Sequence, residues 1–206
     1  MVLATLKLMS AMNWLAKPPV PLSLVNEVLF SIIHFDELTS TNDYIKNNYR
    51  LLPDVSLIRA DYQSAGRGQF SRNWESNRGQ NLLVSLLLKT GINDLSVHSY
   101  EEQVRNSLIS LLDFYGVNAH IKLPNDIFVG DRKISGILIE TKQIAGVYEY
   151  LIIGIGLNVG QTEFPDYLNA TSIALQSPLK IYLEDVFNKF ISMLEVNLAP
   201  LLTKTP

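Results

Sequence analysis

Apolar runs and helically spaced apolar residues alternate along the chain and predict mixed secondary structure. Continuous apolar runs rich in branched side chains are typical of buried strands and predict them over residues 29–35, 55–62 and 81–89. A Ser-Thr capping signal predicts a helix over residues 41–49, and helical spacing predicts further helices over residues 97–115 and 183–198.

The middle of the chain holds closely spaced apolar segments that predict successive hairpins. The expected strands cover residues 119–123, 126–129, 133–142 and 147–159. Gly130-Asp131 and Ala145-Gly146 lie between strands and are typical of tight turns. Hairpins give antiparallel pairing, so we expect an α+β fold with a mixed, mostly antiparallel β-sheet and helices packed on one face. This class does not by itself indicate a function.

The first residues differ from the rest of the chain. Residues 1–28 form a poorly patterned N-terminal lead-in, in which Pro18, Pro19 and Pro21 end any helix begun before them. No internal repeat or low-complexity linker follows, so we expect residues 29–206 to form one domain. No apolar stretch has the length of a membrane-spanning helix, and we expect a cytoplasmic protein with no membrane partner.

The composition excludes several kinds of chemistry. The chain has no cysteine, which excludes disulfides, thiolate catalysis and cysteine-bound zinc. Its three histidines are scattered without metal-ligand spacing. The net charge of −3 argues against a dedicated nucleic-acid binder, whose phosphate contacts need clustered lysine and arginine. A nucleotide ligand stays open, because it needs only one or two well-placed cations.

A polar, glycine-bearing loop after the second predicted strand carries the first candidate chemistry. Gly66 and Gly68 flank Arg67, so the backbone can approach a ligand closely while the guanidinium pairs with a phosphate or carboxylate. Arg72 and Trp74 follow on the same loop. A cation beside an indole that can stack suits a nucleotide monophosphate.

The second segment bends at a Pro-Asn-Asp turn over residues 124–126 and continues as a strand. Simple strand alternation predicts that Lys133 shares a face with Ser135, whereas Gly136 lies on the opposite face. A lysine facing the glycine-bearing loop would form a cationic pocket. Such a pocket suits the charge that develops when a carboxylate attacks a phosphate.

The third segment is the glycine-containing end of the last predicted strand. Gly154 and Gly156 lie inside it, and glycines inside a strand usually mark a bulge or a ligand close to the backbone. Asn158 adds a side chain that both donates and accepts hydrogen bonds. The glycine spacing does not match a dinucleotide fingerprint.

In their order and spacing, four blocks resemble the catalytic domain of biotin–protein ligases, also called biotin–[acetyl-CoA-carboxylase] ligases. The blocks are Ser40-Thr41-Asn42 and residues 63–74, 122–140 and 154–158. The resemblance implies a fold like that of the class II aminoacyl-tRNA synthetase and biotin synthetase group. It also implies two steps: the carboxylate of biotin attacks the α-phosphate of ATP and releases pyrophosphate, and a carrier-protein lysine then attacks the adenylate and releases AMP.

The same resemblance assigns roles to individual residues. The implied biotin-binding set is Ser40, Thr41, Asn42, Gln63, Gly66, Arg67, Gly68, Lys133 and Gly136. The implied nucleotide-binding set is Arg72, Trp74, Asn125 and Asn158. Lys133 would bridge the biotin carboxylate and the α-phosphate, with Arg67 and Asp126 as the other catalytic residues. Asp126 would steer the incoming lysine or hold magnesium.

The implied partners are biotin, ATP, magnesium and the biotin carrier domain of a biotin-dependent carboxylase. Many relatives carry a DNA-binding domain before the catalytic domain and a small β-barrel after it. We expect neither here, and therefore no DNA partner. An exposed sheet edge leaves a homodimer open.

Two other functions remain open: a lipoate–protein ligase of the same fold, and a non-catalytic biotin-binding module. The polar Ser40-Thr41-Asn42 cluster favours biotin over lipoate, and the presence of both Arg67 and Lys133 favours catalysis over binding alone. The loop has Gln69 where many relatives have arginine. We hypothesise that this change lets activated biotin leak more readily.

Overall fold

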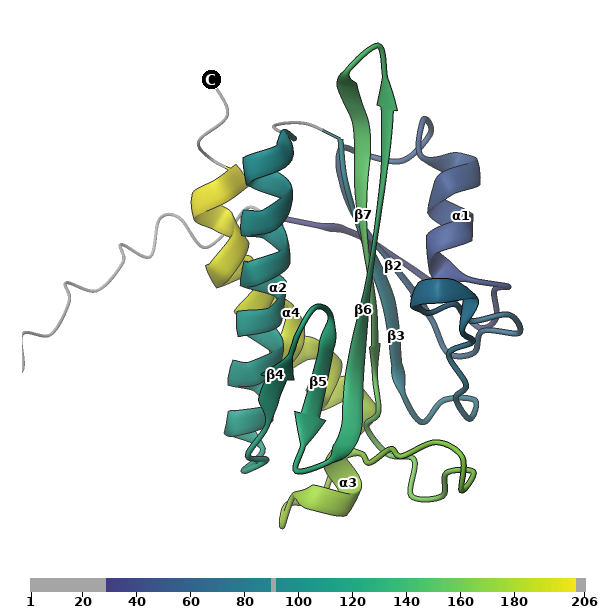
Figure 1. Cartoon of the computed structure of the whole chain (residues 1–206), viewed down its shortest axis with the longest axis vertical. Coiled ribbons are helices and arrows are strands. Elements are labelled where there is room, and N and C mark those ends of the chain that lie inside the picture. The colour runs from purple at the N-terminus through teal and green to yellow at the C-terminus, as the bar shows by residue number, and fades with distance from the viewer. Residues whose placement is uncertain (1–28, 90–91, 203–206) are drawn as a thin grey trace, which may run out of the picture.

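A computed structural model describes residues 29–89 and 92–202, so the predicted lead-in over residues 1–28 lies outside the described part. One seven-stranded sheet forms the centre of the molecule, in the order β1-β2-β3-β7-β6-β5-β4 (Figure 1). The strands are β1 (Ser31–Phe35), β2 (Val55–Ala60), β3 (Leu82–Leu88), β4 (His120–Lys122), β5 (Asp126–Val129), β6 (Arg132–Ile144) and β7 (Val147–Leu157). The helices are α1 (Thr41–Asn48), α2 (Asp94–Phe114), α3 (Ile173–Gln176) and α4 (Leu183–Leu202), with a short 3-10 turn, η2 (Gln69–Ser71).

The strand pairing confirms a mixed, mostly antiparallel sheet. Among the described strands, β1 and β2 pair in parallel and all other neighbours are antiparallel. The predicted hairpin turns form as expected. Ala145 and Gly146 both have positive φ, 51° and 80°, a combination that matches the right-handed twist of the strands the turn joins.

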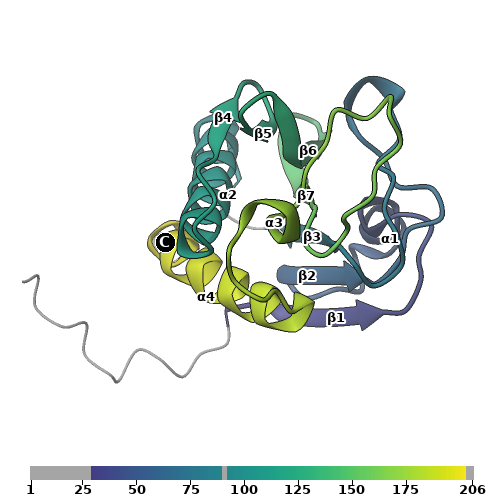
Figure 2. The same cartoon turned by 90° about the horizontal axis from the view of Figure 1, so that it is seen from below.

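Helices cover both faces of the sheet to different extents. Figures 1 and 2 show α2 and α4 against one face and α1 against the other. Leu108 and Phe190 of the two long helices are fully buried in the larger core, and Ile45 of α1 is fully buried in a smaller one. β3 lies between these layers and is buried along its whole length, which explains its unbroken apolar sequence. The long helices thus share one face as predicted, and α1 adds a layer that the sequence did not indicate.

A β-bulge in β6 corrects the predicted alternation around Lys133. Adjacent residues of β5 pair with Ser135 and then with Lys133, so Ile134 has no partner of its own. Such an extra residue shifts the side-chain alternation by one position. Lys133 consequently shares its face with Gly136, because a Cβ on that glycine would lie 3.0 Å from the lysine Nζ. The predicted shared face with Ser135, which is fully buried, was wrong.

Local capping explains a shift in one helix boundary. α2 begins at Asp94, three residues before the predicted start, because Asn93 and Ser96 form a reciprocal capping box. α4 ends at Leu202, beyond the predicted end at residue 198. The single turn α3 follows its N-cap Ser172 and was not predicted.

Candidate functional site

The N-terminus of α1 holds three of the predicted biotin-binding residues against the sheet. Ser40 is the N-cap, with an extended backbone and a side chain that accepts a hydrogen bond from the Asp43 amide (3.4 Å). Thr41 and Asn42 are buried in the first turn. Ile45 lies one turn further on and is fully buried in the smaller core, so the packing of α1 fixes the position of that first turn.

Gln63 and Ser85 join this turn in one hydrogen-bonded cluster. Gln63 Oε1 accepts from the Thr41 backbone amide (2.7 Å) and lies 3.0 Å from the Thr41 hydroxyl. The Ser85 hydroxyl donates to Asn42 Oδ1 (2.5 Å) and lies 2.6 Å from the Thr41 hydroxyl oxygen. Ser85 was not predicted as a site residue. Its signal in the sequence is one polar position inside the apolar run of β3.

Glu140 of β6 is a second residue that sequence reasoning missed. Its carboxylate accepts hydrogen bonds from Asn42 Nδ2 (2.8 Å), Lys46 Nζ (2.5 Å) and an Arg67 Nη (2.8 Å). Burial by itself would raise the pKa of this carboxyl, but the hydrogen bonds from these three side chains lower it below its ordinary value. Glu140 is therefore ionised near neutral pH and links α1, the loop and β6.

The glycines of β6 and β7 make room for side chains. Gly154 and Gly156 keep an unbroken register with both neighbouring strands, so of the two expectations for these glycines, a bulge or a close approach to the backbone, the bulge does not form. A Cβ on Gly154 would lie 2.3 Å from Asn42 Oδ1. A Cβ on Gly156 would lie 2.4 Å from the Trp74 indole, which also contacts Gly136. Any side chain here would displace the asparagine or the tryptophan.

The glycine-bearing loop turns back on itself over η2. Arg67 forms an antiparallel bridge with Asn73, and the Trp74 amide donates to the Gly66 carbonyl (2.9 Å). A Cβ on Gly66 would lie 2.5 Å from the Trp74 carbonyl oxygen, so a larger residue would separate the two halves of the loop. The Arg67 guanidinium also pairs with Asp43 of α1 (2.9 Å). The loop is thus held against the first turn of α1.

Lys133 lies where the bulge of β6 meets the loop. Its Nζ is 2.7 Å from an Asp126 carboxylate oxygen and 5.6 Å from the centroid of the Trp74 ring. Its backbone is fixed from a third side, because its amide donates to the Asn169 carbonyl and its carbonyl accepts from the Thr171 amide, both at 2.9 Å. The Lys133 ammonium group is therefore held in place by Asp126 and the Trp74 ring, and its strand by two backbone hydrogen bonds.

Two adjoining cavities meet at Lys133. The inner cavity, of about 40 Å³, is lined by every predicted biotin-binding residue except Gly66. The outer cavity, of about 320 Å³, is lined by all four predicted nucleotide-binding residues and by Asp126. The residues that line both are Gly68, Gln69, Trp74, Asn125 and Lys133. Asn125 and Asn158 also support the backbone, because each donates its amide to a carbonyl at 2.9 Å.

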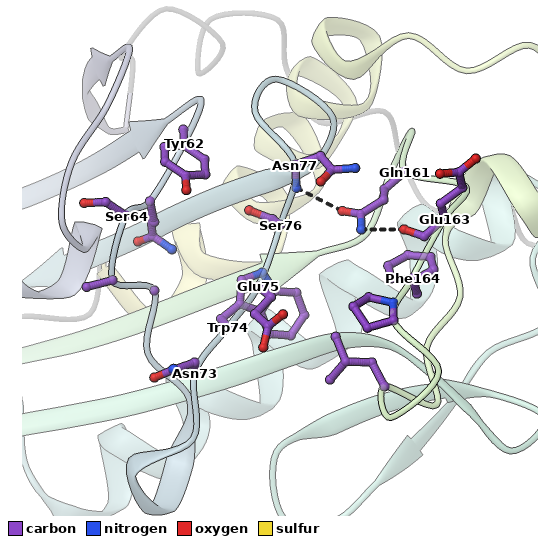
Figure 3. Close-up of a pocket in the computed structure, with 15 residues that line it drawn as sticks. Tyr62, Ser64, Asn73, Trp74, Glu75, Ser76, Asn77, Gln161, Glu163 and Phe164 are labelled. Carbon is purple, nitrogen blue, oxygen red and sulfur yellow. Dashed lines mark hydrogen bonds between the residues drawn. The ribbon is translucent and has the colours of Figure 1, made fainter.

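A third cavity, the side cavity, lies on the other side of the loop and has a volume of about 580 Å³. Figure 3 shows it between the segment that carries Trp74 and the segment from Gln161 to Phe164. Gln161 is buried and joins the two walls, since its Oε1 accepts from the Asn77 amide (3.1 Å) and its Nε2 donates to the Glu163 carbonyl (2.8 Å). Gly66 lines this cavity.

The described residues contain neither a preformed metal cluster nor a membrane-spanning helix. Within residues 29–89 and 92–202, no group of three or more histidine, aspartate or glutamate side chains is placed to share a metal ion. Asp126, the predicted magnesium residue, is ion-paired with Lys133. No helix in the same part of the chain has the length and apolar character needed to span a membrane.

Comparison with known proteins identifies the family. A sequence profile of the biotin/lipoate A/B protein ligase family matches residues 34–158, more than half of the chain. The chain belongs to this family.

Within it, the bifunctional ligase/repressor BirA of Bacillus subtilis is 33% identical over 162 residues, which cover 73% of this chain and 48% of the relative. The biotin–[acetyl-CoA-carboxylase] ligase of Mycobacterium tuberculosis is 27% identical over 58% of this chain and 45% of its own. The chain spans about half the length of these curated relatives.

Solved structures of the family share this fold, which is of the class II aminoacyl-tRNA synthetase-like type. The biotin protein ligase of Aquifex aeolicus, in complex with biotin and ATP, superposes with a TM-score of 0.68 at 27% identity. The match covers 84% of this chain and 72% of that one. A lipoate protein ligase structure from T. acidophilum, 14% identical with a TM-score of 0.56, has the same fold. The predicted fold class and family are thus confirmed.

Proposed function

We propose that this chain binds biotin and ATP, forms biotinyl-adenylate and transfers the biotinyl group to a lysine of a biotin carrier domain. The observation that carries the proposal is the position of Lys133, at the junction of the inner and outer cavities. One ammonium group there can contact a carboxylate from one side and a phosphate from the other. Two mutually repelling anions can thus be held in contact.

The inner cavity supports biotin as the acid. Biotin's ureido ring has both N–H donors and a carbonyl acceptor, and the cavity wall offers hydroxyl and amide groups from Thr41, Asn42 and Gln63. The dithiolane ring of lipoate has no comparable donors or acceptor, so it could not use the further hydrogen-bonding capacity that these groups offer a ligand. This argument favours biotin over lipoate within the same family.

The outer cavity supports ATP as the second substrate. Trp74 offers an aromatic face and Arg72 a cation, while Pro124, Phe164 and Leu168 add apolar surface. Trp74 lines this cavity, and among the described residues none accepts a hydrogen bond from its buried Nε1. Buried donors of this kind gain from a ligand that brings acceptors, as a nucleotide does.

In the first step, a biotin carboxylate oxygen attacks the α-phosphorus as the bond to pyrophosphate breaks. Lys133 and Arg67 would neutralise the charge on the phosphoryl oxygens, an effect worth about 10²–10³ in rate for one well-placed donor. For Arg67 this requires exchanging its contacts with Asp43 and Glu140 for the ligand. In the second step the carrier lysine attacks the acyl carbon, AMP leaves and the amine gives up its proton. Asp126 lies beside Lys133 at this point of the site and would orient the incoming amine.

Magnesium would enter as part of the ATP substrate. Mg²⁺ usually keeps several waters and binds phosphates together with one or two carboxylates. Asp126 is the carboxylate on the wall of the outer cavity that fits this role, once its contact with Lys133 is exchanged for the ion. We expect the reaction in the cytoplasm, with a carboxylase carrier domain as the acceptor and without DNA.

The first half-reaction tests the proposal directly. We expect exchange of labelled pyrophosphate into ATP that depends on added biotin and is not supported by lipoate. Exchange with lipoate alone would assign the chain to the lipoate branch of its family. Biotin binding without any exchange would indicate the binding-only module.

A further inference from the structure

A continuous chain of hydrogen bonds runs from β6 through α1 to β3, behind the wall of the inner cavity. It links Glu140, Asn42, Ser85 and Thr41. We propose that Glu140 is a positioning residue that sets which groups of the inner cavity donate and which accept, by fixing the orientation of the Asn42 side-chain amide. The inference rests on the proposed function, because it concerns recognition of the biotin ring.

The carboxylate determines which way the Asn42 amide points. An ionised carboxylate only accepts hydrogen bonds, so the group 2.8 Å from Glu140 Oε2 must be the Asn42 NH₂. A reversed amide would put two oxygens against each other. Asn42 Oδ1 therefore faces β3, where the Ser85 hydroxyl donates to it over 2.5 Å.

This orientation then fixes the two hydroxyl groups. Ser85 has one hydrogen, and Asn42 Oδ1 takes it. The Thr41 hydroxyl hydrogen then lies between two acceptors, the Ser85 oxygen at 2.6 Å and Gln63 Oε1 at 3.0 Å. A hydroxyl whose hydrogen is already used presents lone pairs. Thr41, on the wall of the inner cavity, is consequently set to accept from a ligand N–H.

Packing around the chain keeps it from rearranging. The Asn42 amide lies on Gly154, where even a Cβ would come within 2.3 Å of Oδ1. Glu140 is held at its other oxygen by Lys46 (2.5 Å) and shares its first oxygen with Arg67 (2.8 Å). Each of these partners donates, so an ionised carboxylate satisfies all of them at once.

Two substitutions would change the direction of these hydrogen bonds in different ways. Glu140→Gln keeps the shape but adds an NH₂ group, against which the Asn42 amide can reverse and present its oxygen. Asn42 would then donate to Ser85 and the Ser85 hydrogen would turn to Thr41, which leaves Gln63 Oε1 as the remaining acceptor for the Thr41 hydrogen. Because Gln63 Oε1 also accepts from the Thr41 amide, an acceptor on a ligand can compete for that hydrogen. Ser85→Ala removes the closer acceptor of the Thr41 hydrogen without reversing the Asn42 amide, so this hydrogen is again shared between Gln63 Oε1 and a ligand.

The test measures ligand discrimination in the full chain. The probes are biotin and cyclic carbamate analogues of biotin, in which a ring oxygen replaces one ureido N–H, with each regioisomer measured separately by calorimetry. The unsubstituted chain should reject the regioisomer that places its oxygen against Thr41. The dissociation constant of this regioisomer divided by that of the other regioisomer should fall about tenfold in Glu140→Gln. It should also fall in Ser85→Ala.

Glu149→Gln is the matched control. It removes the same charge on the same face of the sheet, but its carboxylate accepts from the Tyr49 hydroxyl (2.8 Å), outside the three cavities described above. Its ratio should equal that of the unsubstituted chain. Thermal melting establishes that each variant is folded, and Ser85→Ala decides the question if Glu140→Gln is not.

The possible outcomes separate this inference from the proposed function. A lower ratio of the two dissociation constants in Glu140→Gln and Ser85→Ala, with an unchanged ratio in Glu149→Gln, supports the inference. A ratio that stays unchanged in the folded variants while biotin still binds overturns the role of Glu140 and leaves the proposed function standing. If the unsubstituted chain does not bind biotin, both are overturned.

Discussion

The inner and outer cavities share one wall but differ in how far their polar groups are already paired. In the inner cavity, Thr41 and Asn42 are buried and hydrogen-bonded to groups of the protein. In the outer cavity, Arg72 and Phe70 are exposed. On the wall that the two cavities share, no described residue accepts a hydrogen bond from Trp74 Nε1. One end of the site is thus organised before a ligand arrives, while the other offers charges and aromatic surface.

This difference fits two ligands with different demands. A small ring is recognised by a few hydrogen bonds in fixed directions, and organising them beforehand lowers the cost of binding. A nucleotide phosphate is recognised largely by charge, which tolerates mobile side chains. Substitutions at the two ends should therefore affect different kinetic constants.

The largest expected effect is at the junction. Lys133→Ala should slow adenylate formation about 10²–10³-fold, while biotin affinity falls much less, because the ammonium acts mainly on charge that develops during the reaction. Single-turnover adenylation and calorimetry measure the two quantities. Lys122→Ala, at an exposed lysine of β4, should leave both unchanged. Equal losses of rate and affinity would favour a binding-only module.

The next effect is at the inner cavity. Gly154→Ala should raise the KM for biotin about tenfold or more and leave the KM for ATP nearly unchanged, because the new methyl displaces Asn42. Steady-state kinetics with each substrate measure this. Gly160→Ala is the control, since its Cβ would meet its nearest neighbour at 3.4 Å. An unchanged KM for biotin would mean that Asn42 is not needed in its present position.

A smaller effect is expected at the outer cavity. Arg72→Ala should raise the KM for ATP about 2–5-fold at low salt and less at high salt, because an exposed cation is screened. The KM for biotin should not change. Arg132→Ala, at an exposed arginine at the start of β6, controls for the loss of net charge. An effect independent of salt would contradict a charge-based role.

The smallest effect concerns retention of the adenylate. Gln69 lines both cavities, and Gln69→Arg should slow the release of biotinyl-adenylate about 2–5-fold by adding a cation beside it. Release is measured by rapid dilution of preformed complex into hydroxylamine, which traps free adenylate. Equal release rates in Gln69→Arg and in the unsubstituted chain would contradict the hypothesis that Gln69 allows biotinyl-adenylate to dissociate more readily.

The elements of the fold were predictable because their signals are local. The buried run of β3, the cap at Ser40 and the turn at Ala145-Gly146 each depend on neighbouring residues. The bulge at Ile134 was not predictable, since it depends on how β6 pairs with β5. Lys133 could therefore be chosen from its sequence block, but the face on which it lies could not.

The same distinction applies to the site. The motif residues lie in short, recognisable blocks, and the structure brings them together around two cavities. Glu140 is 98 residues from Asn42 and 73 from Arg67, so no local pattern predicts its contacts. Ser85 is a single polar residue within an apolar strand. Supporting residues of this kind become visible only when the chain is folded.

The most direct test is the intact mass of a biotin carrier domain after incubation with this chain, biotin and Mg-ATP. The account predicts the gain of one biotinyl group, which requires ATP and is lost in Lys133→Ala. A carrier that stays unmodified, while the chain still binds biotin tightly, would contradict it and leave a binding module in place of a ligase.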